Sequence, residues 1–263
     1  MAIDLQSGTV AATGTWGAFR GEMGRWLGRR GLFHLLFWLL LIDGWLYFTV
    51  VTKHGPFGGL GYESLMHMLV LFPIVGAILL TEATVVGEYH SGIAAWTVSK
   101  PMPRSGYLVA KLGGLWVGLS VTAILIPALI AYWWLPRVEP YQFVIPEAPP
   151  LGRFLGALLV VSLVMLLFIT LTGLLGTVIR RRGITAFIAL FAYFLVQVPQ
   201  RALWDNWDRY TPTGLIGTDQ GWAAVTEYVY GEPLNATSAV VTVITLSVLF
   251  TIGSALVYRR LEL

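Results

Sequence analysis

The sequence contains no cysteine among its 263 residues. Disulfide bonds, thiolate metal sites and a cysteine nucleophile are therefore excluded. Charged residues are also scarce: they make up 12% of the chain, whereas a soluble domain carries about 25%. Hydrophobic residues make up 56%, and the mean hydropathy is +0.72. This composition excludes a soluble globular domain, a disordered chain and a disulfide-rich scaffold, and it predicts a protein that crosses a membrane several times.

The sequence also lacks ten-residue segments of alternating polar and apolar side chains, which a membrane β-barrel requires. It has long apolar runs instead, and a spanning helix needs about 20 such residues. We therefore expect an all-α membrane protein with one transmembrane domain over residues 1–263. The fifth of its six spans is short, so it is either completed by residues 200–204 or forms a broken or tilted helix. The predicted spans cover residues 31–51, 65–84, 112–133, 154–178, 184–198 and 239–258.

Lysine and arginine sort to one side of these six spans. Twelve of the 17 fall before the first span, between spans two and three, between spans four and five, or after the sixth. Because basic segments stay in the cytoplasm, we expect both termini to be cytoplasmic, in a bacterial plasma membrane. The first apolar run begins only at Gly31, and no clear small-residue cleavage site follows it. A removable signal peptide is therefore not expected.

Residues 15–30, just before the first span, have the pattern of an amphipathic helix. Arg25 and Arg29 point away from an apolar stripe about 100° wide. This predicts a helix that lies in the cytoplasmic headgroup layer with its apolar side toward the lipid. The alternative is a basic flank that only sets the topology. The stripe consists of Trp16, Phe19, Met23, Trp26 and Leu27.

Residues 85–111 form a long link between the second and third spans. Glu88 and Gly92 lie one helical turn apart, and residues 93–98 predict a short amphipathic helix. Two prolines, the first of them Pro101, end this helix because proline disfavours helical geometry in the residue before it. A tight turn would be enough to join two spans. The extra length of this link therefore indicates a docking surface on the cytoplasmic side.

The string Glu88-x-x-x-Gly92, followed by Ser99-Lys100-Pro101-x-Pro103-Arg104 and then Lys111, resembles the ABC-2 family of ABC-transporter permeases. Members typically read Glu, a Gly-Thr pair, a Leu/Ser-rich turn, Pro-Ile-Ser-Arg and then Gly-Lys. Here Ile93 stands in place of the Thr, and Met102-Pro103 replaces the Ile-Ser pair. The resemblance extends to the interfacial "elbow" helix, the six spans, the basic link after span four and the total length. It covers essentially the whole chain.

The resemblance implies that two permeases pair around a membrane pathway and that each docks on a cytoplasmic ATPase. The short helix within residues 88–99 then corresponds to the coupling helix that enters a groove of the ATPase. No Gly-x-x-x-x-Gly-Lys-Ser/Thr phosphate loop occurs in the chain. We therefore expect no enzymatic activity, metal or cofactor on this chain, with ATP and Mg on the partner. The expected ATPase contacts are Glu88, Tyr89, Gly92, Trp96, Lys100, Pro101 and Arg104.

Two acidic residues within the spans are functional candidates, because charge inside a membrane is costly. Asp43 lines a pathway, pairs with a basic group such as Lys53, or lies solvated near the outer interface. Glu82 is expected to form a salt bridge with Lys111 or Arg30.

Two further segments have open interpretations. The outer loop, residues 201–235, is rich in tryptophan and tyrosine, which is typical of an aromatic belt at the interface or of an outer gate. Small and polar residues in span four predict close packing within the subunit, a dimer face or the lining of a pathway. They are Thr170, Thr172, Gly173 and Gly176.

Together these features predict the permease subunit of an ATP-binding-cassette exporter. Its expected partners are the ATPase, a second permease copy or paralogue, and membrane lipid, but no nucleic acid. Two alternatives stay open: a non-transporting membrane anchor or scaffold subunit, and a stand-alone secondary carrier. A carrier predicts inverted repeats and charges at the midplane, and the sequence has no visible repeat. An anchor predicts that the link between spans two and three tolerates substitution.

Overall fold

The computed structural model describes residues 5–52, 61–90, 103–137, 148–197, 210–216, 224–234 and 236–260. Within these ranges every regular element is a helix. Five helical stretches are long and apolar enough to cross a membrane, which confirms the all-α membrane class. They are Arg29–Val50, Tyr62–Glu88, Arg104–Arg137, Leu151–Ile179 and Thr237–Arg259.

The sixth apolar helix, α10 (Ile184–Gln197), begins where the fifth span was predicted but has only 14 residues. At 1.5 Å per residue it is about 21 Å long, shorter than the roughly 30 Å hydrocarbon core of a bilayer. The described residues therefore contain five full-length candidate spans and one short one. Residues 200–204, which were expected to complete this span, lie outside the described residues.

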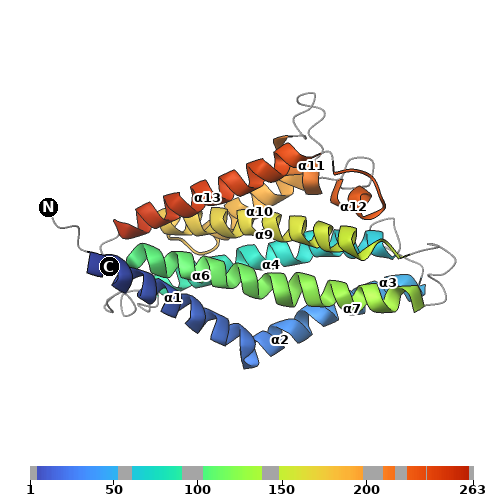
Figure 1. Cartoon of the computed structure of the whole chain (residues 1–263), viewed down its shortest axis with the longest axis horizontal. Coiled ribbons are helices and arrows are strands. Elements are labelled where there is room, and N and C mark those ends of the chain that lie inside the picture. Colours follow the sequence, from blue (N-terminus) through green and yellow to red (C-terminus); the bar gives the residue numbers. More distant parts are fainter. Residues whose placement is uncertain are drawn as a thin grey trace.

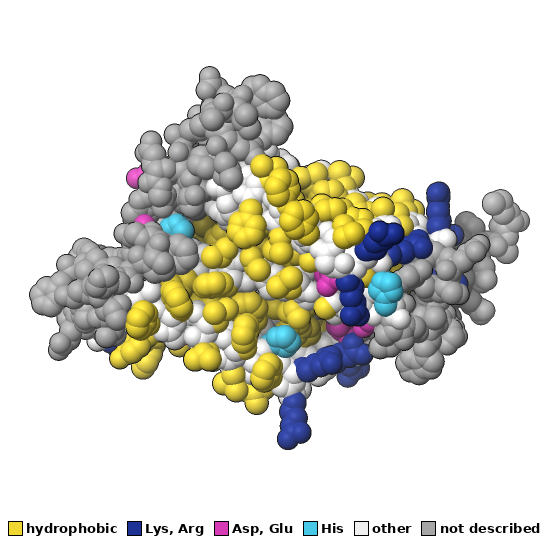
Figure 2. Space-filling view, turned by 180° about the vertical axis from the view of Figure 1, so that it is seen from behind, with side chains coloured by type: hydrophobic (Ala, Val, Ile, Leu, Met, Phe, Trp, Pro, Cys, Tyr) yellow, Lys and Arg dark blue, Asp and Glu magenta, His cyan; other side chains and the backbone are white. Residues whose placement is uncertain are grey.

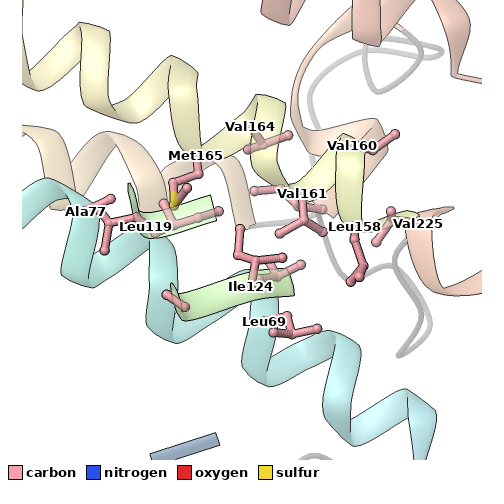
Figure 3. Close-up of a cluster of buried hydrophobic side chains, with 14 of the residues drawn as sticks. Leu69, Ala77, Leu119, Ile124, Leu158, Val160, Val161, Val164, Met165 and Val225 are labelled. Atoms are coloured by element: carbon pink, nitrogen blue, oxygen red, sulfur yellow. The ribbon is translucent and has the colours of Figure 1, made fainter. Parts of the chain in front are cut away.

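The long helices run side by side along the long axis of the molecule, with α9 (Leu151–Ile179) at the centre (Figure 1). Around α9 pack α13 (Thr237–Arg259), α4 (Tyr62–His90), α10 and α6 (Arg104–Leu119). A helix that is apolar on all sides belongs in the interior, and α9 is apolar along nearly its whole length. Figure 3 shows its side chains interlocking with those of α4 and of the third span. The labelled residues there include Leu69, Ala77, Leu119, Ile124, Val161, Val164 and Met165.

The third span is one continuous helix with a widened segment in its middle. It consists of α6, the π-helix η2 (Ser120–Leu125), α7 (Ile126–Trp134) and the 3-10 turn η3 (Leu135–Arg137). Pro127 is the second residue of α7, just after η2. Because proline has no backbone N–H and its ring collides with the carbonyl of the fourth residue before it, the regular α-helical bonding pattern fails at this point. The helix widens there instead of ending.

A second proline, Pro73, lies inside α4 without ending that helix. Proline leaves a carbonyl of the preceding turn without its normal partner. In a membrane such groups need a partner from a neighbouring helix. The carbonyl that Pro73 frees is that of Leu69, four residues earlier. In the same turn, the hydroxyl of Tyr193 of α10 donates to the carbonyl of Val70 at 3.1 Å. The contact also fixes α10 against α4.

The N-terminal helix α1 (Leu5–Leu27) meets α2 (Arg29–Trp38) at a break at Gly28, and η1 (Leu39–Gly44) and α3 (Trp45–Thr52) complete the first span. The predicted helix within residues 15–30 is thus confirmed as a helix. Its stripe is divided, however: Trp16 and Leu27 are 62% and 89% exposed, whereas Trp26 packs on α6.

The side of α6 that receives α1 carries three glycines spaced eight and four residues apart, which places them on one side of the helix. Thr15, Glu22 and Trp26 of α1 occupy the space that side chains at Gly106, Gly114 and Gly118 would fill. The close approach of α1 to α6 therefore depends on glycine.

The two ends of the helix bundle differ in chemistry. At one end, named here the aromatic end, the rings of Tyr62, Tyr132 and Phe154 pack with centroids 4.9–5.9 Å apart. The short helices α11 (Thr213–Ile216) and α12 (Ala224–Val229) belong to the predicted outer loop. Of these, α12 packs on α9 through Tyr228, which lies over Gly156. The remaining parts of that loop lie outside the described residues.

The opposite end, named here the basic end, contains the end of α4, the start of α6, the turn from α9 to α10 and the end of α13. Figure 2 shows one face of the molecule with a wide apolar surface and with lysine and arginine side chains gathered toward one side of it. A surface of this kind matches a lipid-facing belt next to an aqueous, basic region.

Candidate functional site

The basic end brings together the two roots of the predicted coupling segment, residues 85–111. The last turns of α4 form the first root, and the first turns of α6 form the second. Between them, residues 91–102 lie outside the described residues. A buried polar cluster joins the two roots.

This cluster consists of Glu88, Tyr107 and Lys111, and we call it the root cluster. The Tyr107 hydroxyl donates to Oε2 of Glu88 at 2.7 Å, and Nζ of Lys111 donates to the Tyr107 hydroxyl at 3.2 Å. Lys111 also forms an ion pair with Oε1 of Glu88. Tyr107 and Lys111 are four residues apart and therefore share one face of α6. All three polar groups contact one another across the α4–α6 interface.

Burial makes the root cluster energetically important. The side chain of Lys111 is only 5% exposed, and that of Glu88 is 18% exposed. Charges that are removed from water must be paired, because an unpaired one bears the full cost of desolvation. Neither residue can be neutralised without leaving the other charge in a poor environment. Tyr258, near the end of α13, interacts electrostatically with both Glu88 and Arg104, so a third membrane helix adjoins the cluster.

A second link, the turn Arg180–Gly183 between α9 and α10, is fixed to the same end of α4. The backbone carbonyl of Arg180 accepts a hydrogen bond from Nε2 of His90 at 2.9 Å. The backbone N–H of Gly183 points to Oε1 of Glu82 at 3.4 Å. Arg180 and Gly183 have φ angles of 54° and 76°, in the left-handed region that tightens a turn. The guanidinium of Arg182 lies over Gly87.

The structure gives Glu82 a different partner from the predicted one. Lys111 was expected to pair with Glu82, but it pairs with Glu88 instead. Arg30, the other expected partner, is exposed at the start of α2. Glu82 contacts the α9–α10 turn. The cause is helical phase: at about 100° per residue, Glu82 and Glu88 point about 120° apart around α4.

The predicted ATPase contacts fall into two groups. Glu88 lies in the last turn of α4, on the side that faces α6, and Arg104 begins α6. Tyr89 lies in α4, and its side chain is outside the described part of the structure. The other four residues of the set lie outside the described residues altogether: Gly92, Trp96, Lys100 and Pro101. The carboxylate of Glu88 points into the protein, toward Lys111, so its role in this structure is to position the root of the segment.

Asp43 lies in the π-helix η1 of the first span. There it is close to the part of the third span that lies at the aromatic end. Its Oδ1 accepts a hydrogen bond from Nε1 of Trp134 at 3.2 Å. Its Oδ2 is buried and has no hydrogen-bond partner among the residues that the structure describes. The expected partner Lys53 lies outside them. Polar groups inside a membrane are functional candidates, so Asp43 keeps that status.

The polar residues of span four now have a structural explanation. The hydroxyls of Thr170 and Thr172 donate to carbonyls of their own helix at 2.9 and 2.6 Å. Gly173 faces Leu112, and Gly176 faces Val85 and Val86 of α4. These contacts favour close packing within the subunit over a dimer face.

A polar contact that the sequence analysis missed lies between α6 and α9. Nε1 of Trp116 donates to the carbonyl and hydroxyl oxygens of Ser162 at 2.9 and 3.0 Å. The hydroxyls of Ser162 and Ser120 share a hydrogen bond of 2.7 Å. The sequence signal was available in part, because Trp116 and Ser120 are four residues apart and share one face. Nothing in the sequence identified Ser162 as their partner.

No group of three or more His, Asp or Glu side chains within the described ranges is arranged to hold a metal ion. Comparison of the chain with protein-family models and with curated proteins finds no match.

Proposed function

We propose that this protein is the permease subunit of an ATP-binding-cassette exporter. In this proposal two permeases, either two copies or a paralogous pair, form the membrane pathway. Each binds a cytoplasmic ATPase through residues 85–111, and ATP with Mg belongs to that ATPase. The membrane is a bacterial plasma membrane, both termini are cytoplasmic, and α10 with the residues after it completes a sixth span. The basic end is then the cytoplasmic end.

The root cluster is the observation that carries the proposal. A coupling segment can transmit force only if its ends are fixed to helices that cross the membrane. Glu88 and Lys111 fix both ends to each other and to α4 and α6. An anchor subunit would not need a buried ion pair at the base of a long cytoplasmic link. The site therefore favours coupling over passive anchoring.

Helix lengths support the same conclusion. The third span covers 34 residues and α4 covers 29, which correspond to about 51 Å and 44 Å of helix. The hydrocarbon core takes up only about 30 Å. Both helices therefore extend beyond the core, and their charged ends place the root cluster at the basic end, within reach of a partner in the cytoplasm.

The N-terminal region fits the proposal as well. A helix that ends at Leu27 and turns at Gly28 into the first span has the form of an elbow helix. Arg25, Arg29 and Arg30 are exposed around this break, as expected for a corner that meets the headgroup layer. The packing of α1 on α6 connects the elbow to the helix that carries Tyr107 and Lys111.

The experiment that tests the proposal is a detergent pull-down of the tagged full chain from its native membrane, with protein identification and an ATPase assay. Trp96→Asp and Lys100→Glu change the expected contact segment and leave the root cluster intact. Val121→Asn, on an exposed part of the third span, is the control for general loss of fold.

We expect the wild-type chain to recover a stoichiometric ATPase, and the two segment variants to lose it while they keep their thermal stability. Recovery of the chain alone, or with membrane partners that do not turn over ATP, would refute the proposal and favour the scaffold or the carrier.

A further inference from the structure

The turn Arg180–Gly183 is a second candidate contact surface at the basic end. Arg181 and Arg182 are exposed, and the side chain of Arg181 has no hydrogen-bond or ion-pair partner in the described part of the chain. By contrast, Nε of Arg180 donates to the carbonyl of Thr177 at 3.2 Å. Arg180 thus stabilises the turn, whereas Arg181 is exposed to the surroundings.

The turn is also held in one shape. His90 and Glu82 bind its backbone from α4. Within the link, the N–H of Ile184 donates to the carbonyl of Arg182 at 2.9 Å, and the N–H of Thr185 donates to the carbonyl of Arg181 at 3.3 Å. A fixed backbone lowers the entropy that binding must overcome. Such a turn suits a shaped protein surface better than a fluid layer of lipid headgroups, for which flexible arginines are sufficient.

We infer that the turn Arg180–Gly183 is a second docking contact of this subunit and binds a carboxylate-rich surface of the cytoplasmic ATPase. This inference rests on the proposed function and extends it to a link that the sequence analysis did not assign to coupling. The charge of the turn sets the chemistry of the partner, because a cluster of guanidinium groups pairs best with carboxylates. The turn lies directly beside the root of the segment 91–102, so one partner can contact both.

The turn Arg180–Gly183 and the root cluster contact opposite sides of the last turns of α4. Glu82, Gly87 and His90 face the α9–α10 turn, whereas Glu88 faces α6. At about 100° per residue, Glu88 points roughly 100–160° away from each of the other three. A displacement of the turn therefore moves the same helix end that holds α6. The partner would act on three membrane helices through one short stretch of α4.

The test is the double charge reversal Arg181→Glu/Arg182→Glu in the full chain, produced together with its ATPase. The matched control is Arg259→Glu/Arg260→Glu, which changes the charge equally, at exposed residues of the same end. The single variant Arg181→Glu leaves the contact of Arg182 with Gly87 intact and guards against local misfolding. Recovery of the ATPase is measured at increasing salt, which screens exposed charge pairs.

We expect the turn variants to recover about tenfold less ATPase at moderate salt, as for the loss of a steering charge pair, and the control to behave like the wild type. Equal recovery from turn variant and control would overturn the inference, and so would equal loss from both, which would indicate general charge attraction. The purified chain is also titrated with short-chain phosphatidylglycerol while its melting temperature is followed. A lipid-induced shift that disappears only in the turn variant, with the ATPase retained, would assign the turn to lipid and overturn the inference.

If the wild-type chain recovers no ATPase at all, the proposed function itself is wrong and the inference falls with it. If the wild type recovers the ATPase but the turn variant does so equally well, only the inference is wrong.

Discussion

The ion pair between Glu88 and Lys111 allows a quantitative test by mutation. Removal of one member of a buried pair costs about 3–5 kcal/mol when the remaining charge has no water. Glu88 keeps 18% of its side-chain exposure, so the cost is smaller than for full burial. We expect Glu88→Gln to cost about 2–3 kcal/mol, because it leaves the more deeply buried Lys111 charged and unpaired. Lys111→Met should cost about 1–2 kcal/mol, since Glu88 keeps its hydrogen bond from Tyr107 and part of its solvation.

The assay is thermal unfolding of the purified chain in detergent, followed by the fluorescence of its 11 tryptophans. For a chain of this size, 1 kcal/mol corresponds to roughly 2–4 °C in melting temperature, so Glu88→Gln should melt roughly 4–12 °C below the wild type. The double variant Glu88→Gln/Lys111→Met should be more stable than the sum of the two single effects predicts, because no unpaired charge remains. This non-additivity is specific to a direct pair.

The matched control is Arg25→Gln. Arg25 pairs with Glu22 at 2.7 Å, but its side chain is 56% exposed, and exposed pairs contribute only about 0–1 kcal/mol. The reasoning is refuted if Glu88→Gln lowers the melting temperature no more than Arg25→Gln does, or if the effects of Glu88→Gln and Lys111→Met simply add. The exchange Glu88→Lys/Lys111→Glu should restore part of the stability, since it recreates the pair in reverse.

Three further outcomes follow from the packing. Gly118→Ala should lower the melting temperature by an amount equivalent to about 1–3 kcal/mol, because its new methyl group meets the ring of Trp26. The control is Gly21→Ala, whose methyl group meets no atom within 4 Å. It should be neutral or slightly stabilising in the same assay. Ser162→Ala should cost about 1 kcal/mol and shift tryptophan fluorescence, and an unchanged spectrum would argue against its bond with an indole. Asp43→Asn should retain the wild-type melting temperature, because an amide oxygen still accepts from the indole N–H of Trp134. Asp43→Leu should reduce the melting temperature. Equal values for the two variants would contradict the hydrogen bond between Trp134 and Asp43.

The sequence predicted the positions of the long helices well but made them too short. Hydropathy detects only the apolar centre of a span, and polar residues at Tyr62–Ser64 and beyond residue 84 continue α4 without a break. The backbone bonds of a helix do not stop where the side chains become charged. The same property explains why the root cluster was not foreseen, since it lies on parts of α4 and α6 that the sequence analysis placed in the link between two spans, residues 85–111.

The candidate site was predicted in part. Glu88 was identified, but as a surface contact, and its partner Lys111 was named, with Arg30 as the alternative, as a partner of Glu82. Depth along a helix can be read from sequence, whereas the direction of a side chain depends on which helix packs against which side. Without the contacts of α4 with α6 and with the α9–α10 turn, the two glutamates could not be distinguished. For the same reason, no pattern pointed to Ser162 as the partner of Trp116.

The glycine-lined contact between α1 and α6 has a consequence for how the chain is made. Gly118 follows Trp26 by 92 residues, and a ribosome that adds about 5–20 residues per second takes roughly 5–20 s to reach it. During that time α1 has left the ribosome while the helix that will receive it does not yet exist. We expect the nascent α1 to wait in the headgroup layer, with its apolar stripe toward the lipid, until α6 inserts. The membrane surface then serves as a temporary partner for Trp26. The glycine-lined side of α6 replaces it once synthesis has passed the third span.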